Sequence, residues 1–513
     1  MRKLLWLSRV ALCLGLGTSL VACAHTKSRT VADLSAESLA WNAKTDNPLM
    51  DFVPDDAAFV AVTQRGQFLN NEGMQTFVDV FGNVVGAGRN LSGNYVKSLS
   101  RKCGLEPTGK GDAAMYVRDG YGVIHLTVVD AQRATSCANE LVEELSDSVA
   151  DFDCPEDGDG ESRCLVESDE GGWHVYHKVA NGREAPVKFA LHNGGTVYSM
   201  IVYDAGRSIP DDILRPAKKP FVPRDAEKNG VFVGRIRYAS FFESLARFPA
   251  FANEDFLNDV CLQETASFFA DFPETEWQVV VTDAGNIGMR LSTSVASDDT
   301  VHGMKSVITE HAELNDDDVL LRGFVGVSFL NAWEGFANTV RTVIVNRDLQ
   351  CRPLRGIQKE SEEFITKINK SNGSLIRNRN GSFGIFDIQS LSIVIKNMDK
   401  VKRRIFPHGW ANIVCDGLCN FFLTSLLDNL NEEFDSEYFH IKTEEKSMFV
   451  WTSPYQIEET RHTMVKSKDT FLDLRLRKEL LESLGDLENW MVSDYHLSVG
   501  IRDKDFVISL IPE

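Results

Sequence analysis

The sequence predicts an α+β protein of repeated strand–helix–helix–hairpin units, with antiparallel sheets covered by helices and two lobes. Three observations favour this fold class. Four apolar strand patterns each lead into helical periodicity and then into a hairpin turn signal. The distance from leading strand to turn is similar in all four units, which span 57 to 119, 231 to 284, 324 to 380 and 448 to 503. Cys103, Cys261 and Cys351 occupy matching places, at the start of the second helix of their units.

The first unit, near 57–128, opens with a strand at 57–63. Its helix places six apolar side chains on one face: Met74, Phe77, Val78, Phe81, Val84 and Val85. Its hairpin joins 113–117 to 122–128 through Asp119-Gly120, a pair favoured in two-residue turns. We therefore expect a strand, helices and a hairpin in that order.

The second unit, near 231–293, opens with a strand at 231–238. The segment Ser240-Phe-Phe-Glu243 predicts a capping box, which starts a helix that Pro249 ends. A second helix is expected between Cys261 and Pro273. The hairpin strands are predicted at 277–282 and 287–293.

The third unit, near 324–397, opens at 324–327. Its helix carries Phe329, Trp333, Phe336, Val340, Val343 and Ile344, and its hairpin is predicted to turn at Asn380-Gly381. The fourth unit, near 448–511, opens at 448–452. It continues with a helix at 474–490 and a hairpin of 495–501 and 506–511 around Asp503.

Pairing the units predicts an N-terminal lobe at 47–300 and a C-terminal lobe at 318–513. The connection at 296–318 contains acidic runs, which suit an exposed linker. The segments 130–229 and 397–446 do not fit the repeat, so we interpret them as material inserted between units.

The N-terminus has the composition of an export signal. Arg2 and Lys3 precede a mostly apolar stretch that ends in Leu20-Val21-Ala22-Cys23. This segment resembles the signal peptide and lipobox of bacterial lipoproteins. The resemblance implies removal of residues 1–22, a diacylglyceryl thioether on Cys23 and an acylated amino group. Residues 24–46 are polar and lack periodicity, so 23–46 is predicted to be a lipidated cysteine and a flexible tether.

The lipobox implies a bacterial envelope protein that faces the periplasm or the cell surface. Residue 24 is Ala and not Asp, which resembles lipoproteins of the outer membrane. The net charge is −20, which disfavours nucleic acid and anionic headgroups as partners. The membrane is therefore expected to be contacted through the lipid alone, with an unidentified protein or apolar ligand as the further partner.

The chain after the tether contains a short proline step, Phe52-Val-Pro-Asp-Asp56, directly before the first strand. This step resembles uncharacterised proteobacterial envelope lipoproteins, in which Phe/Tyr-Val-Pro-x-Asp leads into the first strand. The resemblance implies no activity.

Eight cysteines remain after processing, and an even number in an exported protein indicates up to four disulfides. They are Cys103, Cys137, Cys154, Cys164, Cys261, Cys351, Cys415 and Cys419. Proximity favours Cys154–Cys164, Cys103–Cys137 and Cys415–Cys419, which leaves Cys261–Cys351. Zinc bound at Cys415-Asp-Gly-Leu-Cys419 is the alternative.

The sequence contains only weak signals for metal sites. Asp157, Asp159 and Glu161 lie in an acidic run that suits calcium, but their spacing fails the EF-hand pattern, and a solvated acidic loop is favoured. His174 and His177 are three apart in a predicted strand, so they face opposite sides and should not share a metal. We expect no cofactor.

Catalytic motifs are missing: the sequence has no nucleophile elbow, no zinc-protease His-Glu-x-x-His and no phosphate-binding loop. We therefore favour a non-catalytic binding or scaffolding role. An apolar-ligand carrier and an envelope hydrolase with an unrecognised site are the alternatives. Eight phenylalanines crowd one stretch, where a core is favoured over a groove for an apolar ligand or partner helix. They are Phe241, Phe242, Phe248, Phe251, Phe256, Phe268, Phe269 and Phe272.

Overall fold

The computed structural model of the chain describes most of the segments that the sequence predicts to be folded. The described residues are 48–64, 112–128, 130–137, 165–180, 183–195, 197–223, 230–248, 258–281, 287–312, 319–328, 335, 341, 345–376, 387–401, 404–416, 424, 439–443, 447–452, 464–483 and 493–512. The lipobox with Cys23, the tether, the first predicted helix at 74–85 and the turn at Asn380-Gly381 lie outside these residues.

The chain divides into two compact units. Unit 1 comprises Met1–Phe269 and Pro273–Met289, and unit 2 comprises Ala270–Phe272 and Arg290–Glu513. The segment 296–318, predicted to be a linker, lies within unit 2, where it supplies a helix and a short strand.

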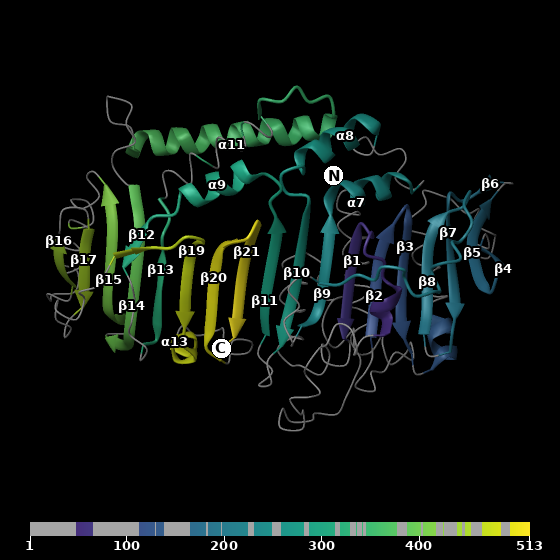
Figure 1. The fold of residues 1–513 in the computed structure, drawn as a ribbon, viewed down its shortest axis with the longest axis horizontal. Coiled ribbons are helices and arrows are strands. Elements are labelled where there is room, and N and C mark those ends of the chain that lie inside the picture. Colours follow the sequence, from purple (N-terminus) through teal and green to yellow (C-terminus); the bar gives the residue numbers. More distant parts are fainter. Residues whose placement is uncertain are drawn as a thin grey trace, which may run out of the picture. The chain divides into compact units, whose positions relative to one another are not determined.

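Unit 1 consists mainly of antiparallel strands; α7 and α8 lie at one end of them, and a further helical segment spans 131–137 (Figure 1). Its elements are the 3-10 helix η2 (Pro48–Phe52), β1 (Phe59–Gln64), β2 (Asp112–Arg118), β3 (Tyr121–Thr127), β4 (Leu165–Glu170), β5 (Trp173–Ala180), β6 (Arg183–Glu184), β7 (Val187–Asn193), β8 (Val197–Asp204), β9 (Gly230–Arg237), α7 (Tyr238–Ala246), α8 (Asp259–Phe268) and β10 (Glu274–Val281). The boundary between the units falls inside β11 (Ile287–Ser294).

The sheet of unit 1 has the strand order β10–β9–β1–β2–β3–β8–β7–β5–β4, and every pair in it is antiparallel. The leading strand β1 lies in its middle, where Val60 is opposite both Tyr116 of β2 and Arg235 of β9. Side chains alternate between the two faces of the sheet. One face therefore carries Val60, Val62 and Ala114, and the other carries Ala61, Ala113 and Met115.

The 3-10 helix η2 and irregular chain cover the first of these faces. Leu49 and Met50 of η2 and Val53 directly after it pack there together with Ile213 and Phe221 from the connection after β8. The two covering segments also bond to each other, because Ala217 N donates to Asp51 O and Phe221 N donates to Val53 O at 2.6 and 2.8 Å. We call residues 48–56 the strap.

Unit 2 is also strand-rich. Its elements are α9 (Asp298–Ser306), β12 (Glu310–Ala312), β13 (Leu321–Val325), α11 (Arg352–Ile376), β14 (Asp387–Val401), β15 (Arg404–Asp416), β16 (Phe439–Thr443), β17 (Ser447–Thr452), β18 (Met464–Lys466), β19 (Thr470–Leu476), α13 (Lys478–Ser483), β20 (Tyr495–Arg502) and β21 (Asp505–Pro512). Its main sheet has the order β21–β20–β19–β13–β14–β15–β17–β16. β12 and β18 pair separately.

The two units share one strand topology. In unit 1 the order β10–β9–β1–β2–β3–β8–β7 has the same connectivity as β20–β19–β13–β14–β15–β17–β16 in unit 2. In both, two leading strands pair with each other, and each also pairs with the first strand of the hairpin that follows it. Unit 1 adds β4 and β5 beyond β7.

The predicted fold class, α+β with sheets covered by helices, is wrong. The described residues are 52% strand and only 24% helix. The segments interpreted as inserted material supply β4 to β8 in unit 1, and β15 and β16 in unit 2. These strands were missed because some, such as β7 and β8, are buried on both faces over most of their length, and such strands lack the apolar–polar alternation of a half-exposed strand.

Two local predictions also need correction. α7 begins at Tyr238 and not at a Ser240 capping box, since its N-cap is Arg237 and no side chain caps it. The start of the helix predicted at 474–490 belongs to β19, so the second leading strand of unit 2 is β19 and not the strand at 448–452.

Two predicted turns are confirmed. Asp119 and Gly120 have φ of 50° and 80° between the paired residues Arg118 and Tyr121. Both values are positive, as a type I′ turn requires. Asp503 has φ of 54° in the hairpin of β20 and β21.

Candidate functional site

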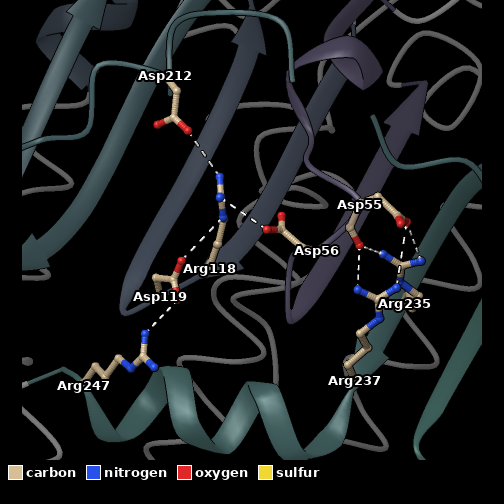
Figure 2. Close-up of polar contacts among 8 residues, drawn as sticks. All are labelled: Asp55, Asp56, Arg118, Asp119, Asp212, Arg235, Arg237 and Arg247. Carbon is tan, nitrogen blue, oxygen red and sulfur yellow. Dashed lines mark hydrogen bonds and ion pairs between the residues drawn. The ribbon is translucent and has the colours of Figure 1, made fainter. Parts of the chain in front are cut away.

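A network of arginines and aspartates joins the strap to the sheet and to α7 in unit 1 (Figure 2). We call it the Arg–Asp network; its members are Asp55, Asp56, Arg118, Asp119, Asp212, Arg235, Arg237 and Arg247. They come from the strap, the β2–β3 turn, the connection after β8, the end of β9 and the residue that follows α7.

The inner part of the network is built on Asp55. Its Oδ1 accepts a hydrogen bond from Arg235 Nη1 at 3.0 Å. Its carbonyl oxygen accepts from Arg235 Nη2 and from Arg237 Nη1, the latter at 2.7 Å. Arg237 Nε also donates to Glu274 Oε2 at 3.1 Å, which ties β9 to β10. One aspartate therefore holds two neighbouring arginines through its side chain and its backbone.

Arg235 is a buried cation. Its side chain is only 4% exposed, and its guanidinium carbon lies 4.8 Å from the centroid of the Phe221 ring. Burial lowers the pKa of Arg235 and Arg237 lowers it further, whereas the bond to Asp55 opposes the shift. Asp55 thus compensates a charge that would otherwise be costly to remove from water.

The outer part of the network is centred on Arg118 at the end of β2. Its guanidinium makes ion pairs with Asp56, Asp212 and Asp119 at 3.3, 3.4 and 3.6 Å. Asp119 in turn accepts from Arg247 Nη1 at 2.7 Å. These carboxylates are mostly exposed, so each pair contributes little to stability by itself.

The two parts of the network hold α7 at its two ends. Arg237 immediately precedes the helix and Arg247 immediately follows it, as Figure 2 shows. At the first end, Tyr238 N also donates to Pro273 O at 3.1 Å, and the Tyr238 hydroxyl bonds to Thr275 Oγ1 at 2.9 Å. At the other end, Gly120 leaves space for the Arg247 side chain, which a Cβ at residue 120 would contact too closely. The network therefore fixes the orientation of α7.

This arrangement suits structure better than catalysis. The eight members comprise four cations and four carboxylates, and each is engaged within the network. A balanced set of paired charges has no net field to attract an ionic substrate. The proline step noted in the sequence supplies Asp55 and Asp56. Through these two residues it attaches the strap to β9 and to the end of β2.

An aromatic cluster lies beside the network on α7, α8 and the neighbouring strands. Its members are Phe59, Tyr238, Phe241, Phe242, Phe268, Phe269 and Trp277. Tyr238 and Phe269 stack at 4.3 Å, and Phe269 also contacts Phe242 and Phe268. The chain of contacts continues through Phe241 and Phe59 to Trp277.

Trp277 fits this cluster because residue 234 is glycine. Gly234 of β9 is directly opposite Trp277 of β10, and any Cβ at 234 would overlap the indole ring. The indole is thereby free to lie over β9, where it meets the Phe59 ring at 5.7 Å. A small residue in one strand thus accommodates a large one in the next.

Every ring of the aromatic cluster is partly exposed. Among the eight phenylalanines that the sequence marked, Phe248 is the buried one, whereas Phe251 and Phe256 lie outside the described residues. The core interpretation is therefore confirmed for Phe248. Phe241 and Phe242 pack against the core cluster that contains Phe248, and they keep part of their surface exposed.

The same topology in unit 2 carries no such cluster in the part that the structure describes. On the corresponding strands of unit 2, Leu497 of β20 is opposite Leu474 of β19, and Leu474 is opposite Gly323 of β13. The short helix after β19 contributes the buried Leu480.

A histidine–serine pair lies inside unit 1. His125 Nδ1 and Ser199 Oγ are 2.8 Å apart on paired strands, and both side chains are 1% exposed. Phe52 of the strap and Tyr116 lie against the imidazole at 5.6 and 5.9 Å. Burial lowers the pKa of His125 to about 4. The pair has the residue types that the hydrolase hypothesis requires, but a substrate cannot reach it while the strap is in place.

His174 and His177 have separate carboxylate partners, as expected for opposite faces of β5. His174 bonds to Asp169 at 2.9 Å and to Glu167 at 3.1 Å, and these bonds raise its pKa. His177 lies 3.1 Å from Glu184. Within the described ranges, no three His, Cys, Asp or Glu side chains are grouped in a way that suits a metal ion.

The cysteines that the structure describes are oxidised. Cys137, Cys261, Cys351 and Cys415 are each disulfide-bonded, so the predicted disulfide chemistry is present. A disulfide at Cys415 removes the thiolate that the zinc alternative needs. Cys103, Cys154, Cys164, Cys419 and the calcium candidates Asp157, Asp159 and Glu161 lie outside the described residues, so the individual pairings stay predictions.

Comparison with known proteins gives no family assignment. The sequence matches no protein-family model, and no curated protein and no solved structure is recognisably similar to it. Among the described helices, none combines the length and the apolar character needed to cross a bilayer.

The inner network predicts an asymmetric response to mutation. Asp55→Ala should lower the free energy of unfolding of unit 1 by about 2–3 kcal/mol, because Arg235 stays buried without its carboxylate. Arg247→Ala should cost at most about 1 kcal/mol, because its pair with Asp119 is exposed. Urea unfolding measures the free energy of unfolding of both variants. Hydrogen exchange of peptides from β9 shows whether the loss lies in unit 1. An equal loss of stability in the two variants would contradict the conclusion that Asp55 compensates a buried charge.

The buried histidine predicts a loss of stability in acid. The pKa of His125 is about 4 in the fold and about 6.5 when unfolded, so from pH 6.5 down to 4 only the unfolded chain gains this proton. The free energy of unfolding should therefore fall by roughly 3 kcal/mol over that window and level off below it. The double variant His125→Leu/Ser199→Ala removes both partners and should lack this component. Identical pH profiles of hydrogen exchange in β3 for the native chain and the double variant would contradict the assignment of this loss of stability to His125.

Proposed function

We propose that this protein is a membrane-anchored lipoprotein of the bacterial envelope that binds a protein partner without catalysis. The contact surface is the aromatic cluster of unit 1. Its anchor is lipid on Cys23, followed by the tether at 24–46, and its placement is the outer membrane.

The observation that carries this proposal is the partial exposure of seven contacting rings, three of which belong to α7, a helix whose two ends are fixed. Aromatic residues provide large apolar area at low entropic cost and are enriched where proteins bind each other. The Arg–Asp network keeps α7 in one orientation, so little order is lost when a partner binds.

The envelope location is supported by chemistry in the folded body as well as by the lipobox. Disulfides at Cys137, Cys261, Cys351 and Cys415 suit an oxidising compartment outside the cytoplasm. The strap begins immediately after the predicted tether, so a chain that leaves the membrane would enter the fold at η2.

Partner binding should depend on the rings of unit 1. Phe242→Ser/Phe268→Ser removes two partly exposed rings and should abolish capture of the partner from detergent-solubilised envelopes, measured by pull-down and mass spectrometry. Phe364→Ser is the matched control, because Phe364 is an exposed phenylalanine of α11 in unit 2. If both variants capture the same proteins as the native chain, the aromatic cluster is not the binding surface.

The anchor is tested separately by fractionation. Cys23→Ser removes the sulfur that the lipobox resemblance assigns to the lipid, so the chain should move from the membrane fraction to the soluble envelope fraction. Metabolic labelling with a fatty acid should mark the native chain and not the variant. Continued sedimentation of an unlabelled Cys23→Ser chain with membranes would contradict lipid anchoring.

A further inference from the structure

One nitrogen of the buried His125 imidazole has no partner. Nδ1 lies 2.8 Å from Ser199 Oγ, whereas Nε2 is buried and makes no hydrogen bond within the described residues. A neutral imidazole carries a proton on one nitrogen, but a protonated imidazole presents an N–H at both. Protonation would therefore place a charged donor at Nε2 without an acceptor, which is strongly unfavourable in a buried site.

The strap is the part of the surroundings of His125 that can move most easily. β2 and β8 flank the histidine in the sheet, where it is opposite Ala114 and Ser199. On the covered face of the sheet, the ring of Phe52 lies 5.6 Å from the imidazole. Phe52 is itself partly exposed, so water reaches the outer side of the ring that contacts the imidazole. Moving Phe52 gives up apolar contact, whereas moving a strand would break the hydrogen bonds of the ladder.

Only the first part of the strap is free to lift. Residues 48–53 are held by apolar packing and by the hydrogen bonds that Ala217 N and Phe221 N donate to their backbone. Asp55, which follows, is bound to the buried Arg235. Residues 48–53 can therefore leave the sheet while Asp55 still compensates the buried guanidinium.

The buried state of His125 is set by its cover and not by a neighbouring charge. Tyr116 of β2 is the titratable side chain in ring contact with it, at 5.9 Å. Further titratable groups on the elements of this face are His192 of β7, Asp51, Asp55 and Asp56 of the strap, and Asp211, Asp212, Arg215, Lys218 and Lys219 of the connection after β8. Burial lowers the pKa of His125, and no charge of the described residues contributes to that shift.

We propose that the first part of the strap is an acid-sensitive cover of unit 1. Protonation of His125 displaces Phe52 and the rest of residues 48–53 from the sheet, and it leaves the strand ladder and Asp55 in place. Acid thereby exposes the apolar face under η2 without unfolding unit 1. This conformational device goes beyond the proposed binding function and does not depend on it.

The expected size of the effect follows from proton linkage. The pKa of His125 is about 4 under the closed strap and returns to its ordinary value of about 6.5 once water reaches the imidazole. Between these values the proton binds only the open form, so opening becomes more favourable as the pH falls. From pH 7 to pH 5 the opening equilibrium should shift by about twentyfold. Aspartate and glutamate carboxylates ordinarily titrate below this window.

The experiment is hydrogen exchange with mass spectrometry on the purified mature chain in detergent, at pH 7 and at pH 5. Protection factors, corrected for the intrinsic exchange rate, are compared for peptides over 48–53 and 217–221 and for peptides of β2. Protection of 48–53 and 217–221 should fall by about twentyfold. It should stay below that of β2 at both pH values, because the strap opens more readily than the sheet unfolds.

Three variants test the role of the histidine. His125→Leu/Ser199→Ala removes both polar partners, so protection of 48–53 should then be nearly the same at the two pH values. His302→Gln removes an exposed histidine of α9 and should leave the twentyfold fall unchanged. Phe52→Ala should uncover the imidazole and raise the pKa of His125 above about 6, measured by NMR of the carbon-13-labelled histidines.

Three outcomes would overturn the proposal. A fall of the same size in the double variant would show that other groups drive the opening. Equal protection of 48–53 and β2 at both pH values would show that unit 1 unfolds as a whole. A pKa of His125 that stays near 4 in Phe52→Ala would show that Phe52 is not the cover, however well the double variant folds.

Discussion

The compensation of Arg235 by Asp55 is the interaction on which the organisation of unit 1 depends. Arg235 is opposite the core residue Val60 in the middle of the sheet, where a lone guanidinium would be strongly unfavourable. Asp55 reaches it only if the strap lies across the sheet. The same aspartate accepts from Arg237, and this bond begins the sequence of contacts that orients α7. One carboxylate thus couples the N-terminal cover of the sheet to α7, which carries three rings of the aromatic cluster.

Local signals in the sequence were sufficient for part of the fold. The turn at Asp119-Gly120, the segment from β9 through α7 and α8 to β10, and the last hairpin follow from turn residues and periodicity over short windows. The strands β4 to β8 and β15 to β16 were not recognised, because their burial depends on partners far away along the chain. Sheet order is a property of such distant pairings, as in β1 with β9, and no local pattern encodes it.

The candidate site was predictable to a similar extent. The crowding of phenylalanines pointed to α7 and α8, although burial, which separates Phe248 from its neighbours, needed the structure. The Arg–Asp network was missed, because Asp55 and Arg235 are 180 residues apart. Its available signal was the proline step before β1, which marks where the strap turns into the sheet. The two units further show that one strand topology accepts different side chains, since β10 places Trp277 opposite Gly234 whereas β20 places Leu497 opposite Leu474.

The position of the strap has a mechanical consequence. Tension applied to the chain ahead of residue 48 acts first on the hydrogen bonds between the strap and residues 217–221, and next on Asp55, before it reaches β1. The contacts of the strap would therefore break before the strand pairing of β1 is loaded. Since Asp55 also holds Arg237 at the start of α7, traction strong enough to displace it would release that end of the helix. In the proposed lipid-anchored protein, a pull on the anchor would therefore loosen the end of α7 that contributes to the proposed binding surface.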